Sequence, residues 1–109
     1  MQPPEGRREL RDNVDAQRYE LTIDGQLVGI AEYRLHGDVV VVPHSEIAAP
    51  LRGNGLGAEL VQAVLDDVRS RGRTIVPRCW YVAEYMREHP ESADLLATTS
   101  RDGGGRAAP

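Results

Sequence analysis

In the first half of the chain, apolar and polar residues alternate. Between residues 18 and 23 every second residue is apolar, and a period of two is typical of a strand that buries one face. The pair Asp24-Gly25 predicts a hairpin turn, and a second strand is expected from about residue 26 to residue 35. The pattern therefore indicates β-structure in this part of the chain.

A third strand is predicted after a tight turn at residues 36–38. It opens with the apolar run Val39–Val42 and then meets Pro43, which has no N–H group to donate to a sheet. We expect the strand to continue past the proline toward Ala48, with a bulge or an unpaired edge position at Pro43. The three strands are predicted to form an antiparallel meander.

The spacing of apolar residues changes to that of a helix after residue 56. The residues that form this apolar stripe are Leu60, Val61, Val64, Leu65 and Val68. The stripe predicts an amphipathic helix over residues 56–71, with Gly72 well suited to its C-terminal end. A short strand is expected at 74–77, and a second helix at about 81–88 that Pro90 stops.

This order of elements predicts an α+β fold. The sheet is expected to be mainly antiparallel and twisted, with one parallel contact after the central helix and with covering helices. A length of 109 residues suits one domain, which we place at residues 14–97. Residues 1–13 and 98–109 are rich in proline, glycine and charge, and we predict flexible tails there.

Composition narrows the classes of function. The net charge is -4 and the thirteen basic residues are dispersed, so nucleic-acid binding is not expected. Cys79 is the one cysteine, and with three histidines it does not make a closed zinc site. No apolar stretch is long enough to cross a membrane and the start is polar. We predict a cytoplasmic protein without a metal.

Three glycines stand immediately before the predicted first helix. Gly53, Gly55 and Gly57 allow the backbone to turn so that several N–H groups face one point. The start of a helix also has free N–H groups and a partial positive charge, and Arg52 adds a full one. The loop therefore predicts a pyrophosphate site, whereas the simpler alternative is that its glycines only turn the chain.

Two other phosphate-binding motifs also place a glycine loop before a helix. A P-loop requires a lysine followed by serine or threonine, and neither follows Gly57. A dinucleotide fingerprint can be read at Gly53, Gly55 and Ala58, but hairpins flank it instead of repeated βαβ units. About 20 residues further on stands Arg78, where that fingerprint needs an acid. The dinucleotide site is kept as a minor alternative.

The pattern Arg52-x-x-Gly55-x-Gly57 closely resembles the Arg/Gln-x-x-Gly-x-Gly/Ala signature of the GNAT superfamily. The flanking segments 44–47 and 77–82 look like its small stand-alone branch of N-acetyltransferase domain-containing proteins, and the similarity runs from about Tyr19 to Leu96. The resemblance implies a minimal GNAT fold with splayed strands, acetyl-coenzyme A as the acetyl donor and an amine as the acceptor.

The resemblance also assigns residues to the coenzyme. Ile47 and Ala48 would touch its pantetheine arm. The residues that would surround its pyrophosphate are Arg52, Gly53, Asn54, Gly55, Leu56, Gly57 and Ala58.

Few side chains near these segments can perform acetyl transfer. His44 is able to accept an amine proton, and Glu46 lies on the same strand face, where it would orient His44 or act as the base. The alternative is an ordinary exposed strand face. In the resembled branch a cysteine lies beside the thioester, so Cys79 is a candidate nucleophile or acid, with a packing role as the alternative. Tyr81 is a substitute acid.

Three hypotheses of function follow. The first is an acetyl-coenzyme A-dependent N-acetyltransferase. The second is a non-catalytic module that binds acyl-coenzyme A or coenzyme A. A protein can retain an intact coenzyme-binding loop after its acceptor site has been lost. The third is a purely structural or protein-interaction domain. The intact Arg52 and glycine loop favour the first two.

Overall fold

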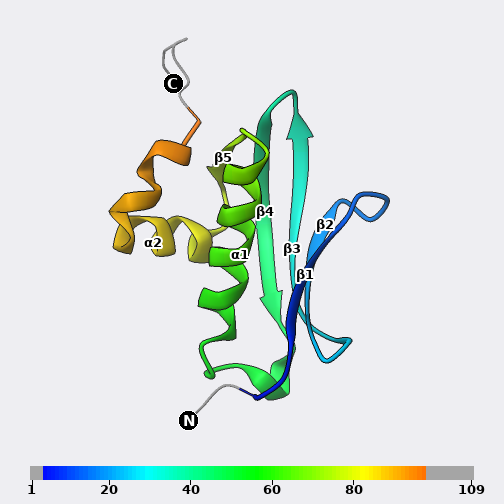
Figure 1. The fold of residues 1–109 in the computed structure, drawn as a ribbon. Helices are drawn as coiled ribbons and strands as arrows, with labels where there is room; N and C mark the ends of the chain where they lie inside the picture. The colour runs from blue at the N-terminus through cyan, green and yellow to red at the C-terminus, as the bar shows by residue number, and fades with distance from the viewer. Residues whose placement is uncertain (1–3, 98–109) are drawn as a thin grey trace.

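The strands with the period-two pattern form the centre of a five-stranded sheet (Figure 1). The computed structural model of the protein describes residues 4–97. Its strands are β1 (Arg8–Asn13), β2 (Arg18–Ile23), β3 (Gln26–His36), β4 (Val39–Ile47) and β5 (Thr74–Pro77). They lie in the sheet in chain order, and every neighbouring pair is antiparallel except β4 and β5, which are parallel.

Two α-helices pack together against one face of this sheet (Figure 1). They are α1 (Leu56–Ser70) and α2 (Trp80–Glu88), and two short 3-10 helices, η1 (Ala49–Leu51) and η2 (Pro90–Leu95), precede α1 and follow α2. The side chains that α1 buries are Leu56, Leu60, Val61, Val64, Leu65 and Val68. This is the predicted apolar stripe, and it joins the inward residues of the strands in one core.

The structure confirms the predicted α+β class and most element positions. Asp24 and Gly25 both have positive φ, 51° and 83°, as a tight hairpin turn requires. Gly72 follows the end of α1 with φ 68°, a left-handed conformation that favours glycine. The second helix begins at Trp80, one residue before the predicted start.

The first thirteen residues are not all a tail, contrary to the prediction. Residues Arg8–Asn13 form the edge strand β1, which pairs with β2 along its whole length. Its one large apolar residue, Leu10, packs against the core, so no alternating pattern marks the strand in the sequence. The other predicted tail, residues 98–109, lies outside the residues that the structure describes.

Polar contacts attach β1 to the rest of the fold. The Arg8 Nε donates a hydrogen bond of 2.8 Å to Glu59 in the first turn of α1. The Tyr33 hydroxyl of β3 donates a hydrogen bond of 2.6 Å to Asp12, and the Arg71 guanidinium lies 3.7 Å from the same carboxylate. These long-range contacts are invisible to a reading of local periodicity, which explains the missed strand.

A β-bulge interrupts the pairing of β3 with β4. Arg34 pairs with Val41 and Glu32 pairs with His44, so between these pairs β3 has one residue and β4 has two. The extra residue lies at Val42–Pro43, where a bulge leaves a position without a ladder bond and so tolerates the missing N–H group of proline. The strand continues beyond Pro43, as predicted.

The strands β4 and β5 separate immediately after this bulge. Their pairing ends where Val42 faces Pro77, and the Cys79 N–H group donates a last hydrogen bond of 2.8 Å to the Val42 carbonyl. The chain then turns into α2. Among the described residues no strand pairs with this side of β4 at residues 44–47. The sheet is therefore splayed here, as the predicted fold class requires.

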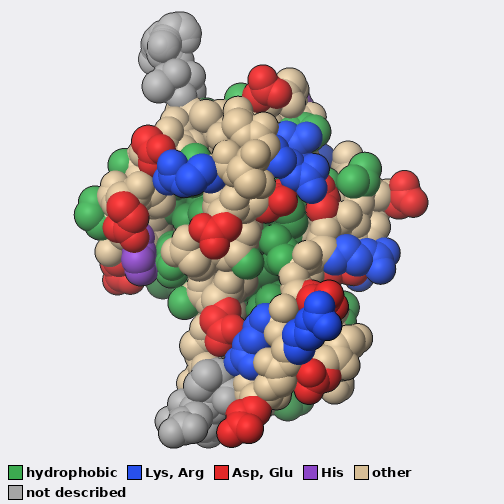
Figure 2. All heavy atoms as spheres, in the orientation of Figure 1, with side chains coloured by type: hydrophobic (Ala, Val, Ile, Leu, Met, Phe, Trp, Pro, Cys, Tyr) green, Lys and Arg blue, Asp and Glu red, His purple; other side chains and the backbone are tan. Residues whose placement is uncertain are grey.

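The helix-bearing side of the molecule carries charges of both signs. In Figure 2 the arginines, aspartates and glutamates of this face are interspersed, with apolar side chains visible in the hollows between them. The face shown has no continuous basic stripe. None of the helices in the described part of the chain is long and apolar enough to span a bilayer.

Candidate functional site

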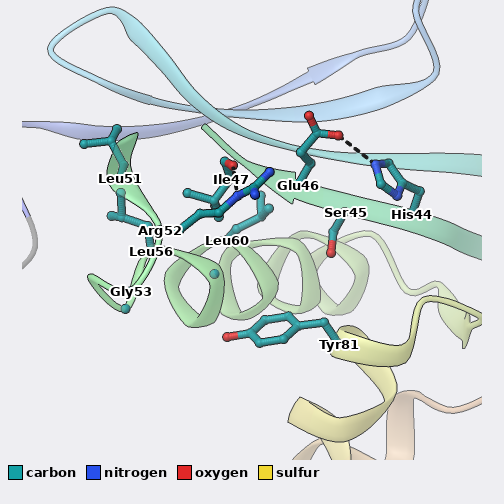
Figure 3. Close-up of a pocket in the computed structure, with 12 residues that line it drawn as sticks. His44, Ser45, Glu46, Ile47, Leu51, Arg52, Gly53, Leu56, Leu60 and Tyr81 are labelled. Carbon is teal, nitrogen blue, oxygen red and sulfur yellow. Dashed lines mark hydrogen bonds and ion pairs between the residues drawn. The ribbon is translucent and has the colours of Figure 1, made fainter. Parts of the chain in front are cut away.

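A cavity of about 510 Å³ opens beside the splayed part of β4 (Figure 3). One wall is β4 itself, at residues 44–47. The far end is the loop and first turn of α1, with residues 51–53, 55–57 and Leu60, and Tyr81 of α2 forms the opposite side. A strand edge without a partner and a glycine-rich helix start therefore face the same space.

Two glycines of the loop before α1 adopt the left-handed backbone conformation. Gly53 and Gly55 have φ of 84° and 80°, which a side chain rarely adopts, and a Cβ atom at either position would meet no protein atom within 4 Å. The space in front of the loop is thus open. Gly55 caps α1, and the N–H groups of Leu56, Gly57 and Ala58 in the first turn have no carbonyl partner within the helix.

The remaining predicted loop residues occupy different environments. The Arg52 side chain lines the cavity and donates from Nε to the Ile47 carbonyl over 3.1 Å. The Asn54 side chain is buried, and its Oδ1 atom has no hydrogen-bond partner among the described residues. Ile47 lines the cavity, whereas Ala48 and Ala58 do not. Ala58 packs against the core.

The bulge decides which residues of β4 point toward α1 and which point to the opposite face of the sheet. Figure 3 shows that Ser45 points toward α1 and Tyr81, whereas His44 and Glu46 point the other way. His44 Nε2 and Glu46 Oε1 lie 2.9 Å apart, and both side chains are about half exposed. The hydrogen bond with His44 lowers the pKa of Glu46, and the charge of Arg52 acts in the same direction. The predicted pair exists, but it does not face Cys79.

The Cys79 thiol lies beside Ser45 at the point where β4 and β5 separate. Its Sγ atom is 3.2 Å from the Ser45 Oγ atom, and the thiol is partly buried. Burial alone raises the pKa of Cys79, but the Ser45 hydroxyl and the nearby backbone amides of Val82 and Tyr81 outweigh it and lower the pKa overall. Cys79 also caps α2, whose positive end favours a thiolate.

Changing Ser45 to alanine is expected to raise the pKa of Cys79. The substitution removes the side-chain hydrogen bond that holds this pKa down, so a smaller fraction of the thiol is ionised at neutral pH. Because only the thiolate is alkylated, iodoacetamide should react more slowly at pH 7, and the midpoint of its rate against pH should move up. An unchanged midpoint would show that the Ser45 contact has no influence on the thiol.

Two features of the cavity escape a reading of the sequence. Ser45 carries no signal of its own, because its side of the strand depends on where the bulge lies. Leu51 and Leu60 also line the cavity, although Leu60 was expected only in the core stripe. Tyr81, considered as a substitute acid, is part of the cavity wall.

Within residues 4–97, no three His, Cys, Asp or Glu side chains form a group suited to a metal ion.

Solved structures share this fold. The solution structure of a GCN5-like protein from Staphylococcus aureus aligns with a TM-score of 0.62 over 85% of this chain and 91% of that chain, at 17% sequence identity. The crystal structure of the ribosomal-protein-S18-alanine N-acetyltransferase from Escherichia coli aligns with a TM-score of 0.53 over 67% of this chain and 50% of that chain, at 19% identity. At these identities the likeness concerns the fold alone.

Sequence comparison gives a second, independent result. Protein NATD1 of chicken and of mouse is 33% identical to this chain over 52 residues, which are 48% of this chain and 47% of each relative. The match thus spans about half the length of those relatives. The family model described as GCN5-related N-acetyl-transferase matches residues 18–95, which include β2 to β5 and both α-helices. The chain belongs to the GCN5-related N-acetyltransferase family.

Proposed function

We propose that the protein transfers an acetyl group from acetyl-coenzyme A to an amine. The observation that carries this proposal is that the unpaired edge of β4 and the glycine loop line one cavity of about 510 Å³. A strand edge offers hydrogen bonds to the amide groups of a pantetheine arm, and free amides at a helix start suit a pyrophosphate. Coenzyme A has both a pantetheine arm and a pyrophosphate, so it suits a cavity that contains both features.

The residues present fit this ligand. The β4 backbone at residues 45–47 would hold the pantetheine arm, with Leu60 as an apolar wall. The amides of Leu56, Gly57 and Ala58 and the Arg52 guanidinium would hold the pyrophosphate. The ligand would then run from the glycine loop toward the place where β4 and β5 separate, which brings its reactive end to Ser45 and Cys79.

Cys79 is the group that we propose to react first. When bound, acetyl-coenzyme A supplies an acetyl group as a thioester. The Cys79 thiolate would attack its carbonyl carbon, so that a bond from Sγ to the acetyl carbon forms while the bond to the coenzyme sulfur breaks. The displaced coenzyme thiolate takes a proton from solvent. The lowered pKa of Cys79 supports a nucleophile, because it increases the thiolate fraction.

His44 and Glu46 serve the second half of the proposed reaction. They lie on the face of the sheet opposite α1 and beside the same splayed segment (Figure 3). An amine nitrogen would attack the acetyl carbon on Cys79 and lose a proton to His44, which Glu46 orients through the 2.9 Å contact. The carbon–nitrogen bond forms while the bond from the acetyl carbon to Cys79 Sγ breaks, so that Cys79 leaves as the thiolate. In this arrangement the amine approaches past the free edge of β4, whose residues 44–47 border the cavity.

One observation favours the alternative of a module that binds coenzyme A without turnover. Cys79 is not among the residues that line the cavity, whereas Ser45, whose Oγ atom lies 3.2 Å from the thiol, is. A site that binds the ligand but keeps the Cys79 thiol out of contact with it would act in sensing or recruitment. The two functions share the coenzyme site and differ in chemistry.

Calorimetry with acetyl-coenzyme A and with coenzyme A tests what both functions share. We expect one site per chain and dissociation constants of about 1 μM to 1 mM, the range in which enzyme KM values fall. ADP, which carries an adenosine pyrophosphate without the pantetheine arm, should bind more weakly because it leaves the β4 edge unused. Absence of heat with both coenzyme forms would remove the acetyltransferase and the binding module together.

A further inference from the structure

Tyr81 differs from the other tyrosines of the chain in its hydroxyl group. Tyr19 donates to Asp67, Tyr33 to Asp12 and Tyr85 to Gln62, at distances from 2.5 to 2.8 Å. Among the described residues, the Tyr81 hydroxyl makes no such hydrogen bond, although its side chain lines the cavity. A donor without a protein partner in a cavity wall is available to a ligand.

The Tyr81 side chain extends toward the start of α1. A Cβ atom built on Gly57 would lie 2.9 Å from the Tyr81 hydroxyl oxygen and 3.0 Å from Cζ. Figure 3 shows the ring reaching from α2 along α1 toward the glycine loop, with the hydroxyl at its far end. The phenol O–H group therefore lies beside the first turn of α1, where the helix amides are free.

This contact gives Gly57 a role different from that of the other two loop glycines. Gly53 and Gly55 have positive φ, whereas Gly57 is helical and has no such backbone requirement. What Gly57 provides is the absence of a side chain under the Tyr81 ring. A Cβ atom at this position would lie 2.9 to 3.1 Å from the end of the Tyr81 ring, so the ring and its hydroxyl would have to shift away from α1 to make room.

We propose that Tyr81 is a positioning residue for the coenzyme, with its hydroxyl donating a hydrogen bond at the phosphate end, and that Gly57 exists to seat its ring. This inference rests on the proposed function, because it assumes coenzyme A in the cavity. The hydroxyl would join the amides of Leu56 and Gly57 and the Arg52 guanidinium around the pyrophosphate. It completes the cradle from the side of α2, which the glycine loop does not reach.

The same geometry argues against Tyr81 as the acid of the reaction. The thiol that we assign to the chemistry lies beside Ser45, at the other end of the cavity from the glycine loop. The Tyr81 backbone is close to Cys79, but the side chain leads away from it toward Gly57. Its hydroxyl thus meets the phosphate end of a ligand and not the thioester.

The test is the affinity for coenzyme A of the Tyr81→Phe protein, measured by calorimetry. A hydrogen bond to a charged group contributes enough that its loss should weaken binding by roughly 10- to 100-fold. Tyr85→Phe is the matched control, because it removes a hydroxyl from the same helix that bonds to Gln62 and lies outside the cavity wall. That variant should bind coenzyme A like the wild type.

A second ligand and a second pair of variants sharpen the result. Pantetheine lacks the phosphates, so the Tyr81→Phe protein should bind pantetheine as tightly as the wild type does. Gly57→Ala should weaken coenzyme A binding in the wild type, by about 10-fold, but not in a Tyr81→Ala background, where the ring that it displaces is already gone. This non-additivity is specific to a contact between the two residues.

The outcomes separate this inference from the proposed function. If the wild type binds coenzyme A and Tyr81→Phe binds it equally well, Tyr81 does not hold the coenzyme and the inference is wrong, while the proposed function stands. Equal weakening of pantetheine and coenzyme A in Tyr81→Phe would also overturn it, because the hydroxyl would then act on the arm. If the wild type itself does not bind, the proposed function fails first.

Discussion

Gly55→Val is expected to weaken binding of acetyl-coenzyme A by about 100-fold or more. Gly55 lines the cavity and a Cβ atom there would have open space around it, so we expect the valine side chain to obstruct the place proposed for the pyrophosphate. Several hydrogen bonds to a charged group would be lost together, each of them contributing roughly 1.5 to 3 kcal/mol. Calorimetry measures the effect, and Gly55→Ala should show a smaller loss in the same direction.

Gly37→Val is the control for backbone strain. Gly37 lies in the turn between β3 and β4, has φ of 60°, and its Cβ position is equally free of neighbours. Both substitutions force a side chain into the left-handed region, at about 1 to 2 kcal/mol of stability. Only Gly55→Val should affect the coenzyme. A folded Gly55→Val protein with wild-type affinity would show that the coenzyme does not bind at this loop.

Cys79→Ala is expected to keep coenzyme binding and to lose acetyl transfer. The substitution removes the proposed nucleophile and leaves the phosphate contacts in place, so the dissociation constant should stay the same while transfer falls by about 100-fold or more. The measurement is transfer to a panel of amines, followed by mass spectrometry. Transfer by Cys79→Ala at the wild-type rate would mean that the thiol only packs, and that the chemistry belongs to His44, Glu46 or solvent.

The covalent step has its own measurement, because Cys79 is the one cysteine of the chain. Mixing the wild-type protein with acetyl-coenzyme A in the absence of an acceptor should add one acetyl group as a thioester, which hydroxylamine removes. Rapid quench followed by intact-protein mass spectrometry detects it. Full turnover without any such adduct would favour direct transfer, and binding without adduct or turnover would favour the non-catalytic module.

Local patterns predicted those elements that bury a regular face. The stripe of α1 was located to within one residue at its C-terminal end, and the turn at Asp24-Gly25 was recognised from its residue types. The strand β1 was missed, because it is held by Arg8 and Asp12 through partners in α1, β3 and beyond, and not by a row of apolar side chains.

Of the predicted site residues, several line the cavity, whereas Ala48, Asn54, Ala58 and Cys79 do not. A His and a Glu two residues apart do contact one another, as the strand period requires. Which face they occupy depends on the bulge at Pro43, and a bulge is set by the pairing with β3, which the sequence of β4 alone does not contain. Likewise the contact between Tyr81 and Gly57 joins α2 to α1, and a strand separates these helices in the sequence. Local sequence patterns therefore do not reveal it.

The bulge in β4 has a consequence for how this family member tolerates changes of length. One extra residue at Val42–Pro43 decides that Ser45 and Ile47 turn toward α1 while His44 and Glu46 turn toward the opposite face. Deleting a single codon there would exchange the two sets without altering any of their identities. For this strand, insertions and deletions are therefore more disruptive than most substitutions, and an alignment that opens a gap at Pro43 would assign the wrong side chains to the face toward α1.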